Sequence, residues 1–310
     1  MSLAPIVLFT YNRLEETKQT VIALQANFLA DESELFIFSD AAKSNTGFEK
    51  IKEVRSYLKT IKGFKNVTIF EAQENKGLAN SIIDGVSQIL KQYETVIVVE
   101  DDLVSSPNFL DFMNQGLSFY QDDKIIQSVN GFSPLINHQT SDVYFQTRPF
   151  PWGWATWKDR WNKDVFDKKA IKLKLNDEVL KDFKKSCGND ISKMLLDSIR
   201  NINDSWYVRW SFYHFTNGKK SVYPKFSLID NVGFGSDGTH CKTINSYKFK
   251  LLNKVTRNFH FINYKNLNKK ITKEFLNYFS AYHKIKIRFE HLLTSQGRKA
   301  LKHDFKEKFL

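Results

Sequence analysis

At residues 95–102 the chain reads TVIVVEDD, an apolar run that ends in the carboxylates Glu100, Asp101 and Asp102. A short run of β-branched residues is typical of a strand buried on both faces of a parallel sheet. Three adjacent carboxylates repel one another, so their place at the end of a buried strand requires a compensating positive charge. A divalent cation that prefers oxygen ligands, Mn²⁺ or Mg²⁺, is the expected source of that charge. The other interpretation is a solvated turn or helix start, where Asp is common.

Three further apolar runs precede this strand and alternate with segments of helical periodicity. The predicted strands lie at 4–10, 35–40 and 67–70, and the predicted helices at 14–26, 48–61 and 78–93. This alternation predicts an α/β fold, a Rossmann-like sheet with helices on both faces. Ligands of such sheets bind beyond the carboxyl ends of the strands. We therefore expect one cleft to be lined by Thr10, Asn12, Arg13, Asp40 and the three carboxylates.

The pattern changes after Pro107 and becomes harder to assign. A helix is predicted at 109–120, a strand at 125–129, helical structure at 168–201 and a short strand at 221–224, whereas 206–215 fits either type. Residues 150–161 hold four of the six tryptophans. The i, i+3, i+7 spacing of Trp154, Trp157 and Trp161 is that of a packed helix face. Indole faces also stack on sugar rings, so Trp152 and Trp154 are candidates for sugar contact as well.

Composition limits the classes of protein that this chain can represent. It has 310 residues, of which 42% are apolar and 15% aromatic, so a large core can form and global disorder is excluded. Two cysteines, Cys187 and Cys241, make neither a disulfide framework nor a metal-binding spacing. This cysteine usage favours a reducing cytosol, and we expect a cytoplasmic protein, with attachment to the inner membrane face as a further expectation.

Basic charge is concentrated in the C-terminal part of the chain. Residues 242–310 hold 17 Lys/Arg and 4 Asp/Glu, a net charge of +13, whereas the other 241 residues carry 29 basic and 30 acidic groups. A near-neutral body is not expected to bind nucleic acid. Lysines mixed with Phe, Leu, Ile and Tyr suit an anionic membrane surface, and the plainer interpretation is a solvated helical face. We predict a body at 1–241, with halves at 1–130 and 131–241, and a basic, mainly helical extension at 242–310.

Several further polar residues are candidates for binding or catalysis. Asp40 could accept hydrogen bonds from a nucleobase or ribose, or form a turn. Lys76 and Asn80 open a helix, where a lysine can meet phosphate. Asp204 lies among aromatic rings, which suits a catalytic base, and a helix cap is its alternative role. His240, in the Gly-rich segment 231–240, is a candidate ligand of a metal or phosphate.

Taken together, these features resemble a glycosyltransferase of the GT-A fold that uses a nucleotide sugar. Phe9-Thr10-Tyr11-Asn12-Arg13 resembles the opening strand and loop of family-two enzymes, and Val98–Leu103 resembles the metal-binding Asp-x-Asp region in its Glu-Asp-Asp form. That form, followed here by Pro107-Asn108-Phe109, is similar to that of the Golgi N-acetylglucosaminyltransferases that start complex N-glycans. In those enzymes an aromatic Gly-Trp segment and an acidic, Trp-flanked segment follow in the order of Trp152–Trp154 and Asp204–Trp206.

The resemblance implies a role for each matching residue. Asp102 would contact the metal, Asp101 would lie beside the donor ribose or the metal, and His240 would belong to a loop that closes over the nucleotide. The remaining nucleotide-sugar contacts would come from Thr10, Asn12, Arg13, Asp40, Lys76 and Asn80. Trp152, Trp154 and Trp206 would contact sugar.

Asp204 would then be the base of an inverting transfer from a nucleotide diphosphate sugar, expected to be UDP-linked, to a glycan or lipid-linked acceptor. The class suggests surface polysaccharide synthesis. Two other functions stay open. A sugar nucleotidyltransferase needs a Gly-rich triphosphate loop, and Thr10 to Thr20 contains no Gly. A non-catalytic module that binds sugar or a lipid surface would leave Glu100, Asp101 and Asp102 without a role.

Overall fold

A mixed sheet forms the centre of the molecule. The computed structural model describes residues 2–44, 47–234, 245, 247–295, 297–299 and 301, and in them the strand order is β3-β2-β1-β4-β8-β6-β9-β7. Four parallel neighbours make up the first half: β3 (Asn66–Glu71), β2 (Glu34–Ser39), β1 (Ile6–Thr10) and β4 (Thr95–Glu100). These are the four strands predicted from the apolar runs, and the expected α/β fold is confirmed.

The second half of the sheet is antiparallel at its centre. β8 (Trp154–Trp157) runs antiparallel to β4 and to β6 (Ile126–Asn130). β9 (Lys220–Pro224) is parallel to β6, and β7 (Val143–Gln146) closes the sheet beside β9. A separate pair of short strands, β5 (Leu103–Ser105) and β10 (Ile229–Asn231), continues directly from β4 and its acidic end.

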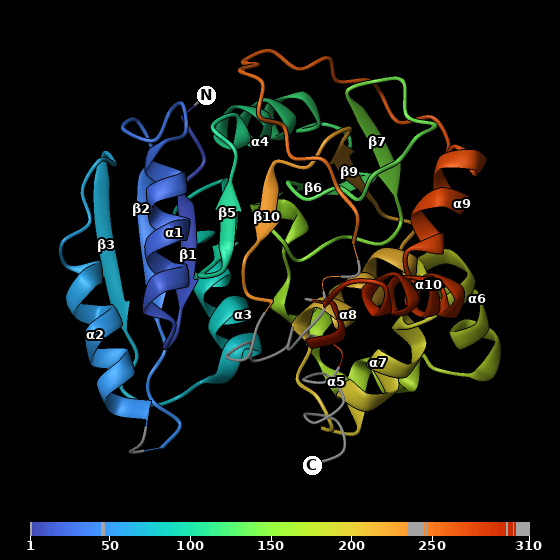
Figure 1. Cartoon of the computed structure of the whole chain (residues 1–310), viewed down its shortest axis with the longest axis horizontal. Coiled ribbons are helices and arrows are strands. Elements are labelled where there is room, and N and C mark those ends of the chain that lie inside the picture. The colour runs from blue at the N-terminus through green and yellow to red at the C-terminus, as the bar shows by residue number, and fades with distance from the viewer. Residues whose placement is uncertain are drawn as a thin grey trace.

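Helices cover both faces of the sheet (Figure 1). Alternate residues of β1 show the division: Ile6 and Leu8 pack on the side of α1, α2 and α4, and Val7 and Phe9 on the side of α3 and α8. The helices of the body are α1 (Leu14–Gln25), α2 (Phe48–Leu58), α3 (Gly77–Ile89), α4 (Phe109–Phe119), α5 (Lys168–Leu173), α6 (Asp177–Cys187), α7 (Ile191–Ile199) and α8 (Trp206–Thr216). The segment 168–201 thus forms three helices, and 206–215 is helical.

The tryptophan-rich segment does not form the helix that the spacing of its tryptophans indicates. Trp154 and Trp157 belong to the central strand β8, and an odd separation places them on opposite faces of the sheet, in different hydrophobic clusters. Trp161 follows the short 3₁₀ helix η2 (Lys158–Arg160) and stacks on Trp154 with ring centroids 5.5 Å apart. The helix interpretation of this spacing is therefore wrong, because the interval of seven is produced by a strand followed by a turn.

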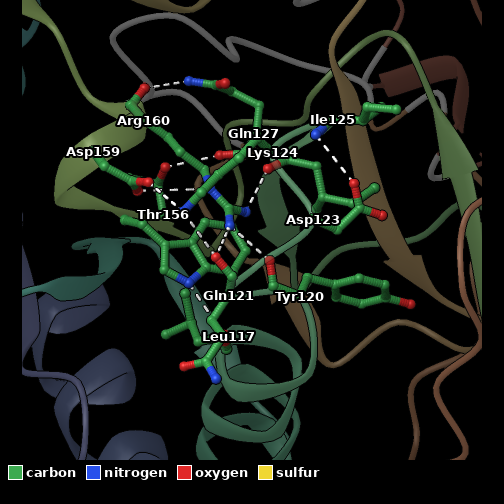
Figure 2. A network of polar contacts seen from close by, with 12 residues as sticks. Leu117, Tyr120, Gln121, Asp123, Lys124, Ile125, Gln127, Thr156, Asp159 and Arg160 are labelled. Atoms are coloured by element: carbon green, nitrogen blue, oxygen red, sulfur yellow. Dashed lines mark hydrogen bonds and ion pairs between the residues drawn. The ribbon is translucent and has the colours of Figure 1, made fainter.

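Arg160 joins three elements of the second half. Figure 2 shows its guanidinium among backbone carbonyls: Nη2 donates to Tyr120 and Gln121 at the end of α4, both at 2.6 Å, and Nη1 donates to Ile126 in β6 at 2.5 Å. The guanidinium carbon also lies 3.6 Å from the ring centroid of Trp157. Burial lowers the pKa of Arg160 to about 10, so the side chain remains a cation at neutral pH. It offsets the partial negative charge at the end of α4.

The C-terminal extension packs against the body. Residues 247–268 contain no helix. Residues 254–262 run along α4, where Asn108 Nδ2 donates to the Lys254 carbonyl at 3.0 Å and Tyr120 Oη to the Ile262 carbonyl at 2.7 Å. α9 (Lys269–Asn277) and α10 (Ala281–Leu292) follow, on the opposite side of the molecule from β3 (Figure 1). Within the described residues, no helix is long and apolar enough to cross a membrane.

Candidate functional site

The carboxyl ends of β1 and β4 lie side by side and bring together charged residues distant in sequence. Arg13, which directly precedes α1, forms an ion pair with Asp101 and donates from Nη1 to Asp102 Oδ2 at 3.0 Å. The Tyr11 backbone N–H donates to Asp101 Oδ2 at 3.1 Å. We call the group of Thr10, Arg13, Glu100, Asp101 and Asp102 the acidic corner.

Negative charge exceeds positive charge within the acidic corner. Three carboxyl groups lie around a single guanidinium, so they would carry two more charges than Arg13 balances only when all three are ionised. Burial raises the pKa of Glu100 well above its usual range, and the charges of Asp102 and Asp101 add to the rise. Burial likewise raises the pKa of Asp101 to about 6, although Arg13 beside it acts in the opposite direction. The folded chain therefore holds carboxylates that lack sufficient counter-charge among the described residues.

Two observations indicate that the acidic corner is shaped for a ligand. The Thr10 hydroxyl is buried and has no hydrogen-bond partner among the described residues. Gly233, just after β10, lies so close that a Cβ there would collide with the Asp102 carboxylate and lie 2.9 Å from Arg13 Nη1. Buried polar groups normally have partners, and a glycine permits close approach of the backbone. A ligand with oxygen atoms or a cation could complete this arrangement.

The side chains at the acidic corner fit a divalent cation that a substrate helps to hold. No group of three or more His, Cys, Asp or Glu in the described parts of the chain is arranged as a ready-made metal site. Mg²⁺ and similar ions are commonly held by one or two carboxylates together with substrate phosphates, so a closed protein site is not required. Asp102 and Asp101 would supply the carboxylates, and a bound cation would favour their ionised forms.

Asp40 lies at the same edge of the sheet but is occupied by protein contacts. Its carboxylate accepts hydrogen bonds from the Lys76 and Gly77 backbone N–H groups, both at 2.9 Å, and from Asn75 Nδ2 at 3.1 Å. Asp40 thereby joins the end of β2 to the start of α3. The backbone N–H groups at the start of α3, which could bind a phosphate, donate instead to the Asp40 carboxylate. Lys76 is exposed, and the Asn80 amide donates to the Lys76 carbonyl at 2.9 Å.

Asp204 lies in a separate cleft of about 790 Å³. Its side chain is 48% exposed, and Oδ1 is paired with Arg209 Nη2 at 3.1 Å and Lys168 Nζ at 3.2 Å. The cap of α8 is Ser205, which accepts from the Val208 N–H, so the cap role considered for Asp204 belongs to its neighbour. The residues that line the cleft come from α3, α5, α8 and the segments between them: Asn80, Phe166, Asp167, Lys168, Lys169, Lys172, Ile199, Asn201, Asn203, Asp204 and Arg209.

The three candidate tryptophans are all buried. Trp154 is fully enclosed and packs against Trp206, Trp210 and Trp161, with a centroid separation of 5.3 Å from Trp206. In this packing neither Trp154 nor Trp206 has a ring face open to a sugar. Trp152 packs edge-on against Phe234, the residue after Gly233, with centroids 5.6 Å apart. Trp152 is thus connected to the acidic corner through the chain that closes over Asp102.

The structure adds residues that sequence reasoning missed and leaves one candidate untested. Gly233 had no signal beyond its place in a Gly-rich segment, and Tyr11 acts through its backbone, which any residue provides. The side chain of Asn12 is half-buried beside Arg13. His240 lies outside the described residues.

Comparison with known proteins gives matches only among solved structures. No family model matches the chain, and no curated protein matches it. A mannosyltransferase from Pyrobaculum calidifontis, in complex with GDP-Man and Mn²⁺, is similar over 41% of this chain and 35% of its own, at 14% identity and a TM-score of 0.31. TarS of S. aureus is similar over 73% of this chain and 36% of its own, at 12% identity and a TM-score of 0.39.

A UDP-glucose pyrophosphorylase complexed with UDP-glucose is similar over 73% of this chain and 91% of its own, at 13% identity and a TM-score of 0.36. The matched region spans only about a third of the mannosyltransferase and of TarS. The finer likeness to N-acetylglucosaminyltransferases has no counterpart among these matches and stays a prediction.

Proposed function

We propose that the protein is an inverting, metal-dependent glycosyltransferase that uses a nucleotide diphosphate sugar, with UDP as the expected nucleotide. One observation carries the proposal: the acidic corner gathers three carboxyl groups around one guanidinium, at the edge of the sheet where such folds bind ligands. A divalent cation bound there would hold a diphosphate through its oxygens and stabilise it as a leaving group. Mn²⁺ or Mg²⁺ suits the carboxylate donors.

Different residues of the acidic corner would contact the cation and the nucleotide. Asp102 would hold the cation, with Asp101 beside it. Arg13 fixes both carboxylates and, with the buried Thr10 hydroxyl, is placed to contact phosphate or ribose oxygens. Asn12 lies next to Arg13 in the sequence. Asp40 would act by holding the start of α3, and with it Lys76 and Asn80, beside the nucleotide.

Asp204 is the proposed base that takes the proton of the acceptor hydroxyl. It lines a cleft that also contains Asn80 from the nucleotide half of the chain. Lys168 and Arg209 both pair with Oδ1, so Oδ2 is the proposed oxygen that takes the proton. Trp152 is the tryptophan that we propose for sugar contact, because it packs against Phe234, the residue that follows Gly233 at the acidic corner. His240 remains a proposed ligand of the metal.

The partners follow from the proposed reaction. The donor is a nucleotide sugar and the acceptor a glycan or a lipid-linked glycan, in surface polysaccharide synthesis. We propose a cytoplasmic protein that works at the inner face of a membrane, with an anionic membrane surface as a partner of the basic extension.

A donor-turnover experiment tests the proposal and separates it from its alternatives. Purified protein is incubated with a panel of nucleotide sugars with and without Mn²⁺, and released UDP or GDP and released pyrophosphate are measured. We expect Mn²⁺-dependent release of nucleoside diphosphate, reduced by at least about 100-fold in Asp102→Asn. Asp31→Asn, an exposed carboxylate in a turn, should retain activity. Pyrophosphate formed from a sugar phosphate and a nucleoside triphosphate would instead indicate a nucleotidyltransferase.

The connection between β1 and α1 already weighs against that alternative. It consists of Tyr11, Asn12 and Arg13 only, and Arg13 is engaged by two carboxylates. A loop that wraps a triphosphate needs glycines and free backbone N–H groups, and this connection has no glycine.

A further inference from the structure

Helix α10 carries apolar side chains on the side that faces solvent. Its large exposed hydrophobic residues recur at intervals of three and four, which places them on one face of a helix. We call this face the α10 stripe. Its members, with their exposed fractions, are Tyr282 (70%), Ile285 (67%), Phe289 (63%) and Leu292 (51%), together with the C-cap residue Leu293 (69%).

The opposite side of α10 is fixed to the protein. Ile287 and His283 are buried, and the ring of His283 lies 4.8 Å from that of Tyr278. Ser280 caps the helix by accepting from the His283 N–H at 3.1 Å. At about 100° per residue, Ile287 points away from the centre of the α10 stripe. The helix is therefore anchored by one apolar face while a second apolar face is presented outward.

Cationic side chains border the α10 stripe. The same helical geometry places Lys286 along one edge and Arg288, with Lys284 beyond it, along the other. The one acidic residue of α10, Glu290, is paired with Lys248 at 2.8 Å. An apolar stripe with lysines at its borders is the arrangement of helices that lie in the interface of an anionic bilayer, where lysines reach the headgroups.

We propose that the α10 stripe is a docking surface for a bilayer containing anionic phospholipid. The stripe would enter the boundary between headgroups and acyl chains with α10 parallel to the membrane plane. Lys284 and Lys286 would contact headgroup phosphates. An apolar face of this size without charged borders would fit a protein partner better, so the charge complementarity selects lipid. The assignment deepens the membrane partner proposed above for the basic extension, and it does not depend on the proposed transferase reaction.

Co-sedimentation of the full-length chain with vesicles tests the proposal. The vesicles contain phosphatidylcholine with or without phosphatidylglycerol. We expect the wild type to bind the phosphatidylglycerol vesicles more tightly, with binding that weakens as salt is added. The double variant Ile285→Ser/Phe289→Ser should lose at least about tenfold in partition coefficient. Lys284→Gln/Lys286→Gln should remove most of the preference for phosphatidylglycerol.

A matched control removes exposed apolar surface elsewhere. Ile22→Ser alters a residue of α1 that is 61% exposed, and it should bind vesicles like the wild type. Far-UV circular dichroism and Mn²⁺-dependent UDP binding, measured on each variant, separate loss of docking from loss of fold or of the nucleotide site.

Three results would overturn the proposal. The first is a wild type that does not bind the phosphatidylglycerol vesicles, and the second is an Ile285→Ser/Phe289→Ser variant that binds them as tightly as the wild type. The third is a wild-type dimer in sedimentation equilibrium that the same variant dissociates, which would mean that a second copy of the chain covers the α10 stripe.

Discussion

Two arginines, Arg13 and Arg148, are each surrounded by polar partners, and their environments differ in charge. Arg148 is completely buried and pairs with Asp190 at 2.7 and 3.1 Å, one cation with one carboxylate. It also donates to the Cys187 carbonyl at 2.8 Å and to the Tyr207 hydroxyl. Arg13 faces three carboxyl groups, and the nearby Thr10 hydroxyl has no hydrogen-bond partner in the described part of the chain. The balanced pair of Arg148 and Asp190 indicates a structural role. The excess of carboxyl groups around Arg13 indicates a place where a ligand binds.

The two arginines also connect different parts of the chain. The Arg148 guanidinium lies 3.6 Å from the ring centroid of Phe279, so it fastens the C-terminal extension to α6 and α7. Arg13 contacts residues that follow β4 and, through Gly233, the chain that follows β10. Substitution at the first site should therefore affect stability, and substitution at the second should affect ligand binding.

Arg148→Met should produce the largest change. Removing the guanidinium leaves Asp190 buried without its partner, which should lower the free energy of unfolding by about 3–5 kcal/mol. Urea unfolding followed by circular dichroism measures the loss. Arg200→Met, at an exposed arginine, should change stability by less than about 0.5 kcal/mol. A loss below about 1 kcal/mol in Arg148→Met would contradict the structural role.

Arg13→Gln should destabilise the protein in a way that metal corrects. Without Arg13 the three carboxylates lose a counter-charge, and we expect a loss of about 2–3 kcal/mol in the presence of EDTA. Mn²⁺ should restore much of this loss, because an ion that binds only the native state stabilises it. Thermal unfolding with EDTA and with Mn²⁺ provides the comparison. An equal Mn²⁺ effect on wild type, Arg13→Gln and Arg148→Met would show that the metal does not bind beside Arg13.

Gly233→Ala should weaken ligand binding, because Asp102 or the backbone at Gly233 must shift to make room for the new side chain. The added Cβ would push against the Asp102 carboxylate and Arg13, so we expect Mn²⁺-dependent UDP binding to weaken by about tenfold. Isothermal titration measures the affinity. Gly47→Ala is the control, since its Cβ would meet Ala42 at an ordinary 3.8 Å and no other described residue is closer. Equal affinity in the wild type and Gly233→Ala would mean that the close approach to Asp102 is unimportant for binding.

The pH dependence of stability should show the smallest effect. Although burial acts in the opposite direction, Arg148 lowers the pKa of Asp190. A carboxylate with a lowered pKa in the folded state contributes stability above its unfolded pKa of about 3.9, and that contribution is lost as pH falls through the folded value. Below about pH 4, wild-type stability should therefore fall more steeply than that of Asp190→Asn. Parallel curves in acid unfolding experiments would contradict this assignment.

The first half of the fold could be predicted from sequence because each strand there is a continuous apolar run. β8 was missed because it has only four residues, from Trp154 to Trp157. Its neighbours in the sheet, β4 and β6, come from distant parts of the chain. β5 and β10 have three residues each, too few to show a period. Local patterns do not encode such pairings, since they depend on tertiary contacts.

The location of the acidic corner also followed from sequence, because parallel strands bring their carboxyl ends to one edge. The pairing of Arg13 with Asp101 and Asp102 did not follow, since it joins residues almost ninety positions apart. Asp40 illustrates the same limit: its carboxylate was available for a ligand in the sequence and is bound to the α3 backbone in the structure.

Titration of the protein with Mn²⁺ in the presence of UDP tests the central claim most directly. Bound and free Mn²⁺ are measured by electron paramagnetic resonance for the wild type and for Asp102→Asn. The charge surplus at the acidic corner predicts uptake of about one Mn²⁺ per chain by the wild type and none at that affinity by the variant. A wild type that takes up no Mn²⁺, or a variant that takes up as much as the wild type, would contradict the account.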